Sequence, residues 1–442
     1  MSKKYFLSLM LLLIFAVGCS SQSNTDNASN SSSTDDNTES QPEKTLRFMT
    51  NGNENNGDYL VVTSIAEDYK NEVNPNFNLE IESIPTQSQY FQKLQTYIAS
   101  NQMPDFFKLP NGPIAETLVE QDKLVDVKDT LQEFGELDNF HSSVIDFLSF
   151  EDGSLYLFPE GRYGEAFWYY TEPFEELGLE KPTTFEEFID VSETLKEAGY
   201  TPINVAGKER WQLIRYLSHI PLRLTHYDFI NGLKTGETSL TTDIGMKSLN
   251  FLHELGQMEA FQVGFSNTDY TDSINQFIGG GQGVMHYNGS WEIAQFEEKY
   301  AAGEMDYFFI PEVAGEDNVG PKTSITAGLA YAFNKDTFDE TTKDFFKYLV
   351  ENYHERANEE GFMSPLKGDA PENASQLFVD FSKDLDDVEL GGLSWDDKLD
   401  PASTEEMGVA ANELALGMIT PEEFAERIDT VIDENAPAFF GE

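Results

Sequence analysis

Cysteine and histidine are both scarce in this chain of 442 residues. There is one cysteine, Cys19, which has no second cysteine to form an internal disulfide with. The six histidines include no H-x-x-x-H pair, the spacing that lets two side chains on one helix hold a metal. A G-x-S-x-G motif, typical of a serine hydrolase, is also missing. These absences argue against a disulfide-stapled domain, a histidine-based metalloenzyme and an α/β-hydrolase.

Basic residues are also few. Lys and Arg number 28 against 79 Asp and Glu, which gives a formal net charge of −51. Such a surface repels phosphates, so we exclude nucleic acids and anionic lipid surfaces as partners. The excess of acidic over basic residues favours solubility at high ionic strength. A halophilic or alkaline habitat of the organism is one hypothesis. The simpler alternative is an acidic, solvated surface with no role in binding.

Long apolar runs are missing apart from one at the N-terminus. Lys3 and Lys4 precede 13 nearly all apolar residues, Tyr5 to Val17. This run is shorter than the about 20 apolar residues of a membrane-spanning helix and has the layout of a signal peptide. The stretch Ala16-Val17-Gly18-Cys19 resembles a bacterial lipobox, with Ala where Leu is usual. The resemblance implies that residues 1–18 are removed and that Cys19 is diacylated. The alternative is an ordinary signal peptide with an incidental cysteine.

The next segment, residues 19–44, is rich in Ser, Asn, Thr and Asp and has almost no apolar residues. It cannot form a core, so we expect a disordered tether. The rest of the chain is globular in composition, because the whole sequence is 39% hydrophobic and 13% aromatic.

The globular part begins with alternating strands and helices. Strands are predicted at 45–50 and 77–85, and helices at 59–73 and 90–102. This order predicts a mostly parallel sheet with helices on its faces, and ligands bind such sheets at the carboxyl ends of the strands. We therefore expect the loop from Asn51 to Asp58 and the loop around Asp105 to face one crevice. Further strands are predicted at 152–159, 166–170, 200–207, 283–288, 306–311 and 325–334, and further helices at 182–199 and 420–436.

Glycine gathers in residues 277–291, FIGGGQGVMHYNGSW. The spacing fits neither G-x-G-x-x-G nor a G-x-x-x-x-G-K-[ST] loop, so we do not interpret it as a phosphate site. We expect the first glycines to end a helix that starts near Thr271. Gly289 is then expected to turn the chain at the end of a strand, so that Trp291 projects into the crevice. The alternative is that Trp291 belongs to the core.

Six groups of residues occur in the order found in a known family. They are Asn74-Pro75; Tyr90, Lys93-Leu94, Ala99 and Pro104-Asp105; Asp152-Gly153, Tyr156 and Pro159; Leu177-Gly178-Leu179 with Pro182 to Phe188; Gly199 and Pro202-Ile203; and Phe277, Gly281, Met285, Gly289 and Trp291. Over about residues 45–440 the chain resembles the extracellular solute-binding proteins of ATP-driven sugar importers, the maltose-binding-like group. It departs from the usual pattern with Phe185 in place of Trp and with extra glycines before Met285.

The resemblance implies an α/β fold of the type II periplasmic-binding-protein class. Each of two lobes would contain a mostly parallel sheet flanked by helices, with a hinge between the lobes. The segments expected are 45–170 and 316–372 for the N-lobe, and 171–315 and 373–442 for the C-lobe.

The implied function is capture of a sugar or oligosaccharide between the lobes and its delivery to membrane permease subunits of an ABC transporter. The protein would be a monomer, anchored by lipid at the extracytoplasmic face of the cell membrane of a Gram-positive bacterium. No catalysis, cofactor or metal is expected.

A sugar ring has an apolar face, on which aromatic rings stack, and a hydroxyl rim, which short polar side chains bind. The aromatic candidates are Trp291, Trp211, Trp395, Tyr90, Tyr163 and Trp168, although a core position suits Trp168 better. The polar candidates are Asp105, Glu54, Asn53, Glu165 and Asn288.

Other classes of function stay open at this stage. With 79 acidic residues, a carboxylate pair suitable for glycoside hydrolysis can always be found, so a secreted glycosidase-like enzyme is one alternative. A binding protein for a solute other than a sugar is another. A structural surface protein or adhesin would predict repeats or an all-β body, and the sequence shows neither.

Overall fold

The computed structural model describes residues 43–54, 57–84, 87–150, 152–386, 388 and 395–440. The expected signal peptide, the expected lipidation site Cys19 and nearly all of the expected tether lie outside these residues. Contacts divide the chain into Met1–Ser40 and Gln41–Glu442, and every described helix and strand belongs to the second unit. None of the helices within the described residues is long and apolar enough to cross a membrane.

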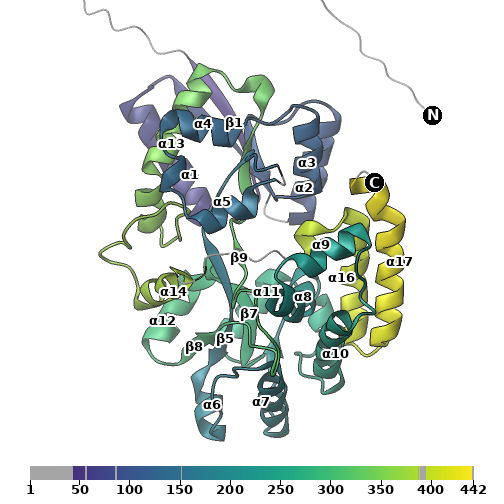
Figure 1. The fold of residues 1–442 in the computed structure, drawn as a ribbon. Helices are drawn as coiled ribbons and strands as arrows, with labels where there is room; N and C mark the ends of the chain where they lie inside the picture. The colour runs from purple at the N-terminus through teal and green to yellow at the C-terminus, as the bar shows by residue number, and fades with distance from the viewer. Residues whose placement is uncertain are drawn as a thin grey trace, which may run out of the picture. The chain divides into compact units, whose positions relative to one another are not determined.

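The first sheet has the strand order β2-β1-β3-β10-β4 (Figure 1). β1 (Lys44–Thr50) pairs in parallel with β2 (Phe77–Ser83), as the sequence predicted, and also with β3 (Phe106–Leu109), a strand that the sequence analysis did not predict. β10 (Ala330–Phe333) runs antiparallel between β3 and β4 (Leu157–Phe158). A hydrophobic core, which we call the first core, surrounds this sheet and includes residues of α1 (Gly57–Glu72) and α13 (Glu340–Glu359).

The second sheet has the order β6-β7-β5-β8, and a fifth strand, β9, pairs with the start of β5. β6 (Ile203–Asn204) and β7 (Met285–Gly289) are parallel. β5 (Tyr163–Tyr170) runs antiparallel to β7, to β8 (Met305–Phe308) and to β9 (Ile325–Thr326). The expectation of a mostly parallel sheet is therefore wrong here, because β5 enters from the first sheet at the edge where β6 and β7 end.

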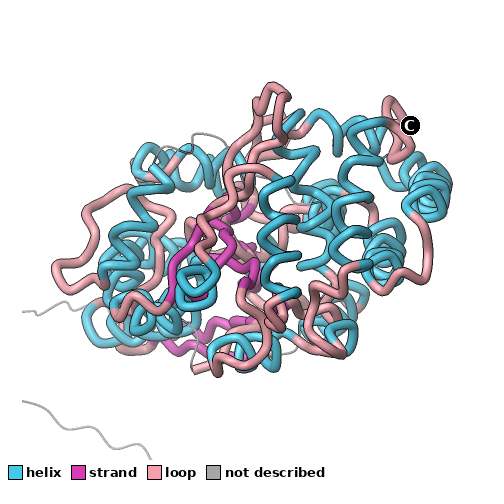
Figure 2. The backbone as a smooth tube through the Cα atoms, turned by 90° about the horizontal axis from the view of Figure 1, so that it is seen from below, coloured by secondary structure: helices cyan, strands magenta, loops and turns pink. Residues whose placement is uncertain are grey.

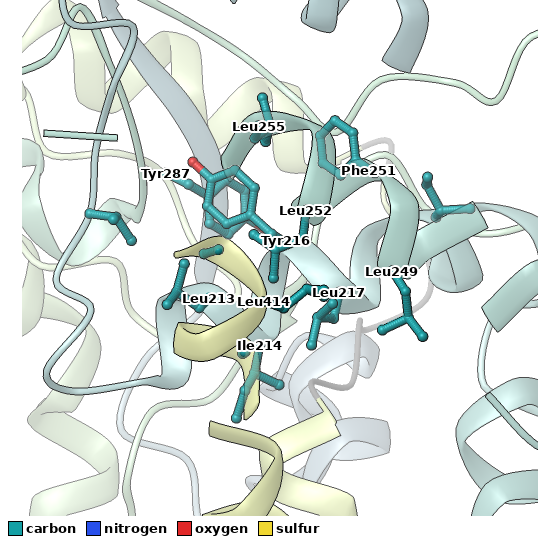
Figure 3. Close-up of a cluster of buried hydrophobic side chains, with 14 of the residues drawn as sticks. Leu213, Ile214, Tyr216, Leu217, Leu249, Phe251, Leu252, Leu255, Tyr287 and Leu414 are labelled. Carbon is teal, nitrogen blue, oxygen red and sulfur yellow. The ribbon is translucent and has the colours of Figure 1, made fainter. Parts of the chain in front are cut away.

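Both faces of the second sheet are buried, which explains why residues 166–170 of β5 form an unbroken apolar run. Phe167 and Tyr169 lie in the core of one face, and Ala166 and Trp168 lie in the core of the other. Figure 3 shows part of the first of these cores, where Leu213 and Leu217 of α8 pack with side chains of α10, α16 and β7. Seen from below, the strands lie among helices (Figure 2).

Helices cover the two faces in separate groups. The face of Phe167 packs against α7 (Phe185–Glu197), α8 (Trp211–Thr225), α9 (Asp228–Thr235), α10 (Asp243–Gln257), α16 (Pro401–Ala415) and α17 (Pro421–Phe440). The face of Trp168 packs against α11 (Tyr270–Ile278), α12 (Ile293–Ala301) and α14 (Gln376–Asp386). α7 begins with a capping box formed by Thr184 and Glu187.

The remaining helices and 3₁₀ turns complete the fold. They are α2 (Gln87–Ala99), α3 (Pro113–Glu120), α4 (Val127–Phe134), α5 (Ser142–Leu148), α6 (Thr171–Leu177), α15 (Trp395–Lys398) and the 3₁₀ turns η1 (Leu137–Asn139), η2 (Phe265–Asn267), η3 (Ser290–Glu292) and η4 (Lys335–Thr337).

We name three crossovers between the two sheets and their cores, and Val388, which follows α14, lies in the first core again. The first lies between β4 and β5, the second between β9 and β10, and the third between Leu366 of the first core and Leu377 of α14. β5 and β9 both belong to the second sheet, whereas the expected segments put both strands in the N-lobe. The segment boundaries at 170, 315 and 372 stay predictions.

Candidate ligand-binding site

One edge of the second sheet collects most of the predicted site residues. β7 ends there at Gly289, opposite Glu165 near the start of β5. β6 ends there at Asn204, next to His286 of β7. The chain leaves β6 toward α8, which begins with Trp211, and it leaves β7 through η3, which contains Trp291. The antiparallel entry of β5 therefore brings segments far apart in the sequence to one edge.

Four aromatic side chains meet at this edge: Tyr163, Trp211, Tyr270 and Trp291, which we call the aromatic group. The ring centroids of Trp211 and Trp291 are 6.1 Å apart at 63°. Tyr163 meets Trp291 edge to face at 5.7 Å, and Tyr270 lies 6.2 Å from Trp211. Trp211 and Trp291 are each only half-buried.

The glycines around Trp291 have two different roles. α11 ends at Ile278, and Gly280 and Gly283 follow with φ of +74° and +109°, so the prediction that glycines end this helix is confirmed. Gly289 differs, because its backbone is extended with φ −93° and ψ 168°. A Cβ at this position would overlap the six-membered ring of Trp291. The expected sharp turn at Gly289 is therefore wrong, and close approach of the indole ring explains the glycine.

Asn288 and Glu165, two predicted polar site residues, are fully buried beneath the aromatic group. The side-chain oxygen of Asn288 accepts the backbone N–H of Gly289 at 2.9 Å. Glu165 accepts from Nε of Arg215 at 3.0 Å, and the guanidinium of Arg215 lies 5.2 Å from the Trp211 ring centroid. Glu165 thus holds Arg215, which contributes a cation–π contact to Trp211. The side-chain amide of Asn288 also donates to the Tyr270 hydroxyl at 3.1 Å.

Asn53 and Glu54 follow the carboxyl end of β1, as predicted, with Asn53 half-buried and Glu54 exposed. The expected position of Asp105 is wrong. It precedes β3, and its carboxylate accepts the backbone N–H of Arg47 at 2.7 Å, at the amino edge of that strand. Tyr90 is fully buried in the first core, where its hydroxyl donates to the backbone oxygen of Lys108 at 2.6 Å.

The last two tryptophans lie in the cores. Trp395 is 2% exposed and stacks on Phe229 at 5.7 Å and 19°, so its expected place in the sugar site is wrong. The short helix α15 packs against α8 and α9 and buries this ring. Trp168 is fully buried against Phe381, which confirms that a core position suits it better.

Sequence reasoning missed a buried charge cluster at the carboxyl edge of the first sheet. Nζ of Lys108 lies 2.7 Å from Asp58 and 2.6 Å from Glu160, and we call these three residues the charge triad. Each is no more than 7% exposed. Burial raises the pKa of the Glu160 carboxyl to about 7, although Lys108 opposes this shift. The available signal was a lysine inside the apolar run FFKLP.

The charge triad and the aromatic group are in contact through Tyr163. Its hydroxyl donates to Glu160 at 3.1 Å, while its ring packs on Trp291 and, at 5.3 Å, on Phe362. A Cβ on Gly328 would lie 3.1 Å from the Glu160 carboxyl group. Segments of the first two crossovers and Phe362, which follows α13, therefore meet at Glu160 and Tyr163. Within the described ranges, no three His, Cys, Asp or Glu side chains are grouped to hold a metal ion.

The two-sheet architecture is the type II fold found in solved structures of solute-binding proteins. Residues 54–352 match the model of the family named bacterial extracellular solute-binding protein, and the chain belongs to this family. It is 29% identical to the Multiple sugar-binding protein of Streptococcus mutans over 154 residues, which is 33% of this chain and about a third (35%) of that protein. It is 22% identical, over 71% of its length and 70% of the relative, to an uncharacterized ABC transporter extracellular-binding protein of Pyrococcus horikoshii.

Solved structures share the fold at low sequence identity. A chitin oligosaccharide binding protein superposes with a TM-score of 0.78 at 21% identity, covering 89% of this chain and 99% of that one. The structure described as SBP RafE in complex with raffinose superposes with a TM-score of 0.64 at 17% identity, covering 88% and 99%. At these identities the likeness shows the fold alone.

Proposed function

We propose that this protein is the lipid-anchored, extracytoplasmic substrate-binding component of an ABC importer, and that it binds a sugar or oligosaccharide between its two sheets. The observation that carries the proposal is the aromatic group, with Trp211 and Trp291 half-buried at the edge of the second sheet. Aromatic faces of this kind stack on the C–H face of a sugar ring. The relatives named for sugars or oligosaccharides support this class of ligand.

The partners follow from the same proposal. Membrane permease subunits would receive the sugar, while Cys19 would hold the monomeric protein to the membrane surface. No cofactor or metal takes part, and a bound sugar leaves chemically unchanged. A glycosidase would instead release hydrolysed sugar during titration, which chromatography of the titrated mixture detects.

Two tryptophan variants test the sugar site. A thermal-shift screen of mono- and oligosaccharides identifies a ligand, and calorimetry gives its affinity. Trp291→Ala should weaken binding by a factor of roughly 30 to 1,000, the effect of losing about 2–4 kcal/mol at a binding hot spot, with a small change in melting temperature. Trp395→Ala is the matched control, because it removes a core ring from α15 and should cost about 3–5 kcal/mol of folding stability.

The folded fraction of Trp395→Ala should bind sugar normally. The reverse pattern, with Trp291→Ala melting much lower but binding as wild type, would make Trp291 a core residue and remove the basis of the proposal.

Mass spectrometry of the membrane fraction tests the anchor. The expected mature protein begins at Cys19 and carries diacylglycerol on this residue, since two acyl chains hold a protein at a membrane firmly. A chain that retains residues 1–18, or that begins at any other residue, would rule out the lipid anchor.

A further inference from the structure

The indole N–H of Trp291 is held inside the protein. It donates to the hydroxyl oxygen of Tyr270 at 2.7 Å. Tyr270 is the first residue of α11, whose N-terminus is capped by the Asp269 carboxylate accepting the N–H of Asp272 at 3.0 Å. Trp291 lies on a separate segment, the turn η3 after β7. This hydrogen bond therefore ties the edge of the Trp291 ring to the capped N-terminus of α11.

The hydroxyl of Tyr270 is fully used by its neighbours. A phenol has one hydrogen to donate and two lone pairs that accept. The hydrogen goes to Oε1 of Glu292. The lone pairs accept from Trp291 and, at 3.1 Å, from the side-chain amide of Asn288. The Tyr270 hydroxyl consequently has no free hydrogen or lone pair with which to bind a ligand, and Tyr270 acts through Trp291.

Glu292 defines the direction of this hydrogen-bonded network. It is 6% exposed, and its second oxygen accepts from the side-chain amide of Gln295. No lysine, arginine or histidine of the described residues forms an ion pair with it. Burial raises the pKa of the Glu292 carboxyl to about 7, while the hydrogen bonds from Tyr270 and Gln295 oppose the rise. A buried carboxylate without a cation is costly unless hydrogen bonds stabilise it. Here Glu292 accepts a hydrogen bond from the Tyr270 hydroxyl, so both lone pairs of that hydroxyl oxygen accept from Trp291 and Asn288.

We propose that Tyr270 is a positioning residue of the sugar site. Its hydroxyl donates a hydrogen bond to Glu292 and accepts one from Trp291, and it thereby fixes the plane of the Trp291 ring so that one face meets the ligand. This inference rests on the proposed function. Without this hydrogen bond, the indole can rotate about its side-chain torsions, and binding a sugar must then order it, which weakens affinity.

A double-mutant cycle tests the proposal. Tyr270→Phe keeps the ring beside Trp211 and removes only the hydroxyl, and it should weaken sugar binding about tenfold. Trp291→Phe keeps an aromatic face and removes the N–H. Once Trp291→Phe is present, adding Tyr270→Phe should change affinity little, because the hydrogen bond that couples the two residues is already lost. If Tyr270 served only general stability, the losses of affinity in Tyr270→Phe and Trp291→Phe would instead multiply in the double mutant.

Tyr200→Phe is the matched control. The Tyr200 hydroxyl also donates to a carboxylate, Glu176 at 2.6 Å, but none of the aromatic group contacts it. This variant should bind sugar as wild type does. Selective ¹⁵N labelling of tryptophan adds a readout without sugar, in which the indole N–H resonance lost in Trp291→Phe should shift in Tyr270→Phe and stay in place in Tyr200→Phe.

The outcomes separate the two proposals. If Trp291→Ala loses binding while Tyr270→Phe binds as wild type, or if the two effects multiply in the double mutant, the positioning role is wrong and the sugar site stands. If the wild-type protein binds no sugar in the screen, the proposed function fails and the positioning role fails with it.

Discussion

Gly289 is a residue whose lack of a side chain makes room for the Trp291 ring. Its backbone is extended, a conformation open to any residue, so conformational freedom is not the reason for glycine here. The Trp291 ring occupies the space that a Cβ would take. The glycine-rich stretch therefore combines two effects, left-handed conformations at Gly280 and Gly283 and close packing at Gly289.

Replacing Gly289 by alanine should displace the Trp291 ring. Overpacking of this kind costs about 1–3 kcal/mol, so sugar affinity should fall by roughly 5- to 150-fold. Gly281→Ala is the control in the same stretch, because a Cβ there meets nothing within 4 Å and its φ is not left-handed. Calorimetry of the two variants checks this. If Gly289→Ala binds as tightly as Gly281→Ala, ring packing is not the reason for the glycine.

The sequence predicted residues of the site where a local pattern set their positions. Trp291 follows a strand and Trp211 follows a strand and loop, and both lie at the sheet edge. Trp395 and Asp105 depended on tertiary contacts instead. The partner of Trp395 is Phe229 of a distant helix, and Asp105 precedes its strand rather than following it. Local polarity carries no information on either contact.

Strands show the same limit at the scale of elements. Residues 325–334 read as one strand, but the structure divides them at Gly328, with φ of +72°, into β9 of the second sheet and β10 of the first. Alternation of apolar residues predicts an extended segment and says nothing of the sheet it joins. The direction of β5, which brings the site together, was beyond prediction for the same reason.

The charge triad holds β3, α1 and the first crossover together, and Lys108 is its only cation. Lys108→Met should lower the free energy of unfolding by about 3–5 kcal/mol, because it leaves two carboxylates buried without a counter-charge. Lys123→Met is the control, since Lys123 pairs with Asp336 at the surface and such pairs contribute about 0–1 kcal/mol. Denaturant unfolding measures the free energy of unfolding of both variants. Equal losses would show that the charge triad contributes no more to stability than a surface ion pair.

The net charge of −51 acts on the whole molecule. Mutual repulsion of surface carboxylates destabilises a compact state, and salt screens it to about 3 Å at 1 M. We expect the melting temperature to rise steadily from low salt to 1 M sodium chloride. Choline chloride should have a similar effect if screening is the cause and sodium binding is not. A melting temperature that falls with salt would show that the surface ion pairs outweigh the repulsion.

The position of β10 in the first sheet has a consequence for the order of synthesis. β10 lies between β3 and β4, although it follows them in the chain by more than 170 residues. A nascent chain that ends before Ala330 contains four strands of this sheet, but β4 has no partner and β3 has an unpaired edge. Unpaired edges are prone to association with other chains. The ribosome must therefore release nearly three quarters of this protein before its first lobe can close, and a chain of this topology suits export in an unfolded state, with folding completed after the whole chain has crossed the membrane.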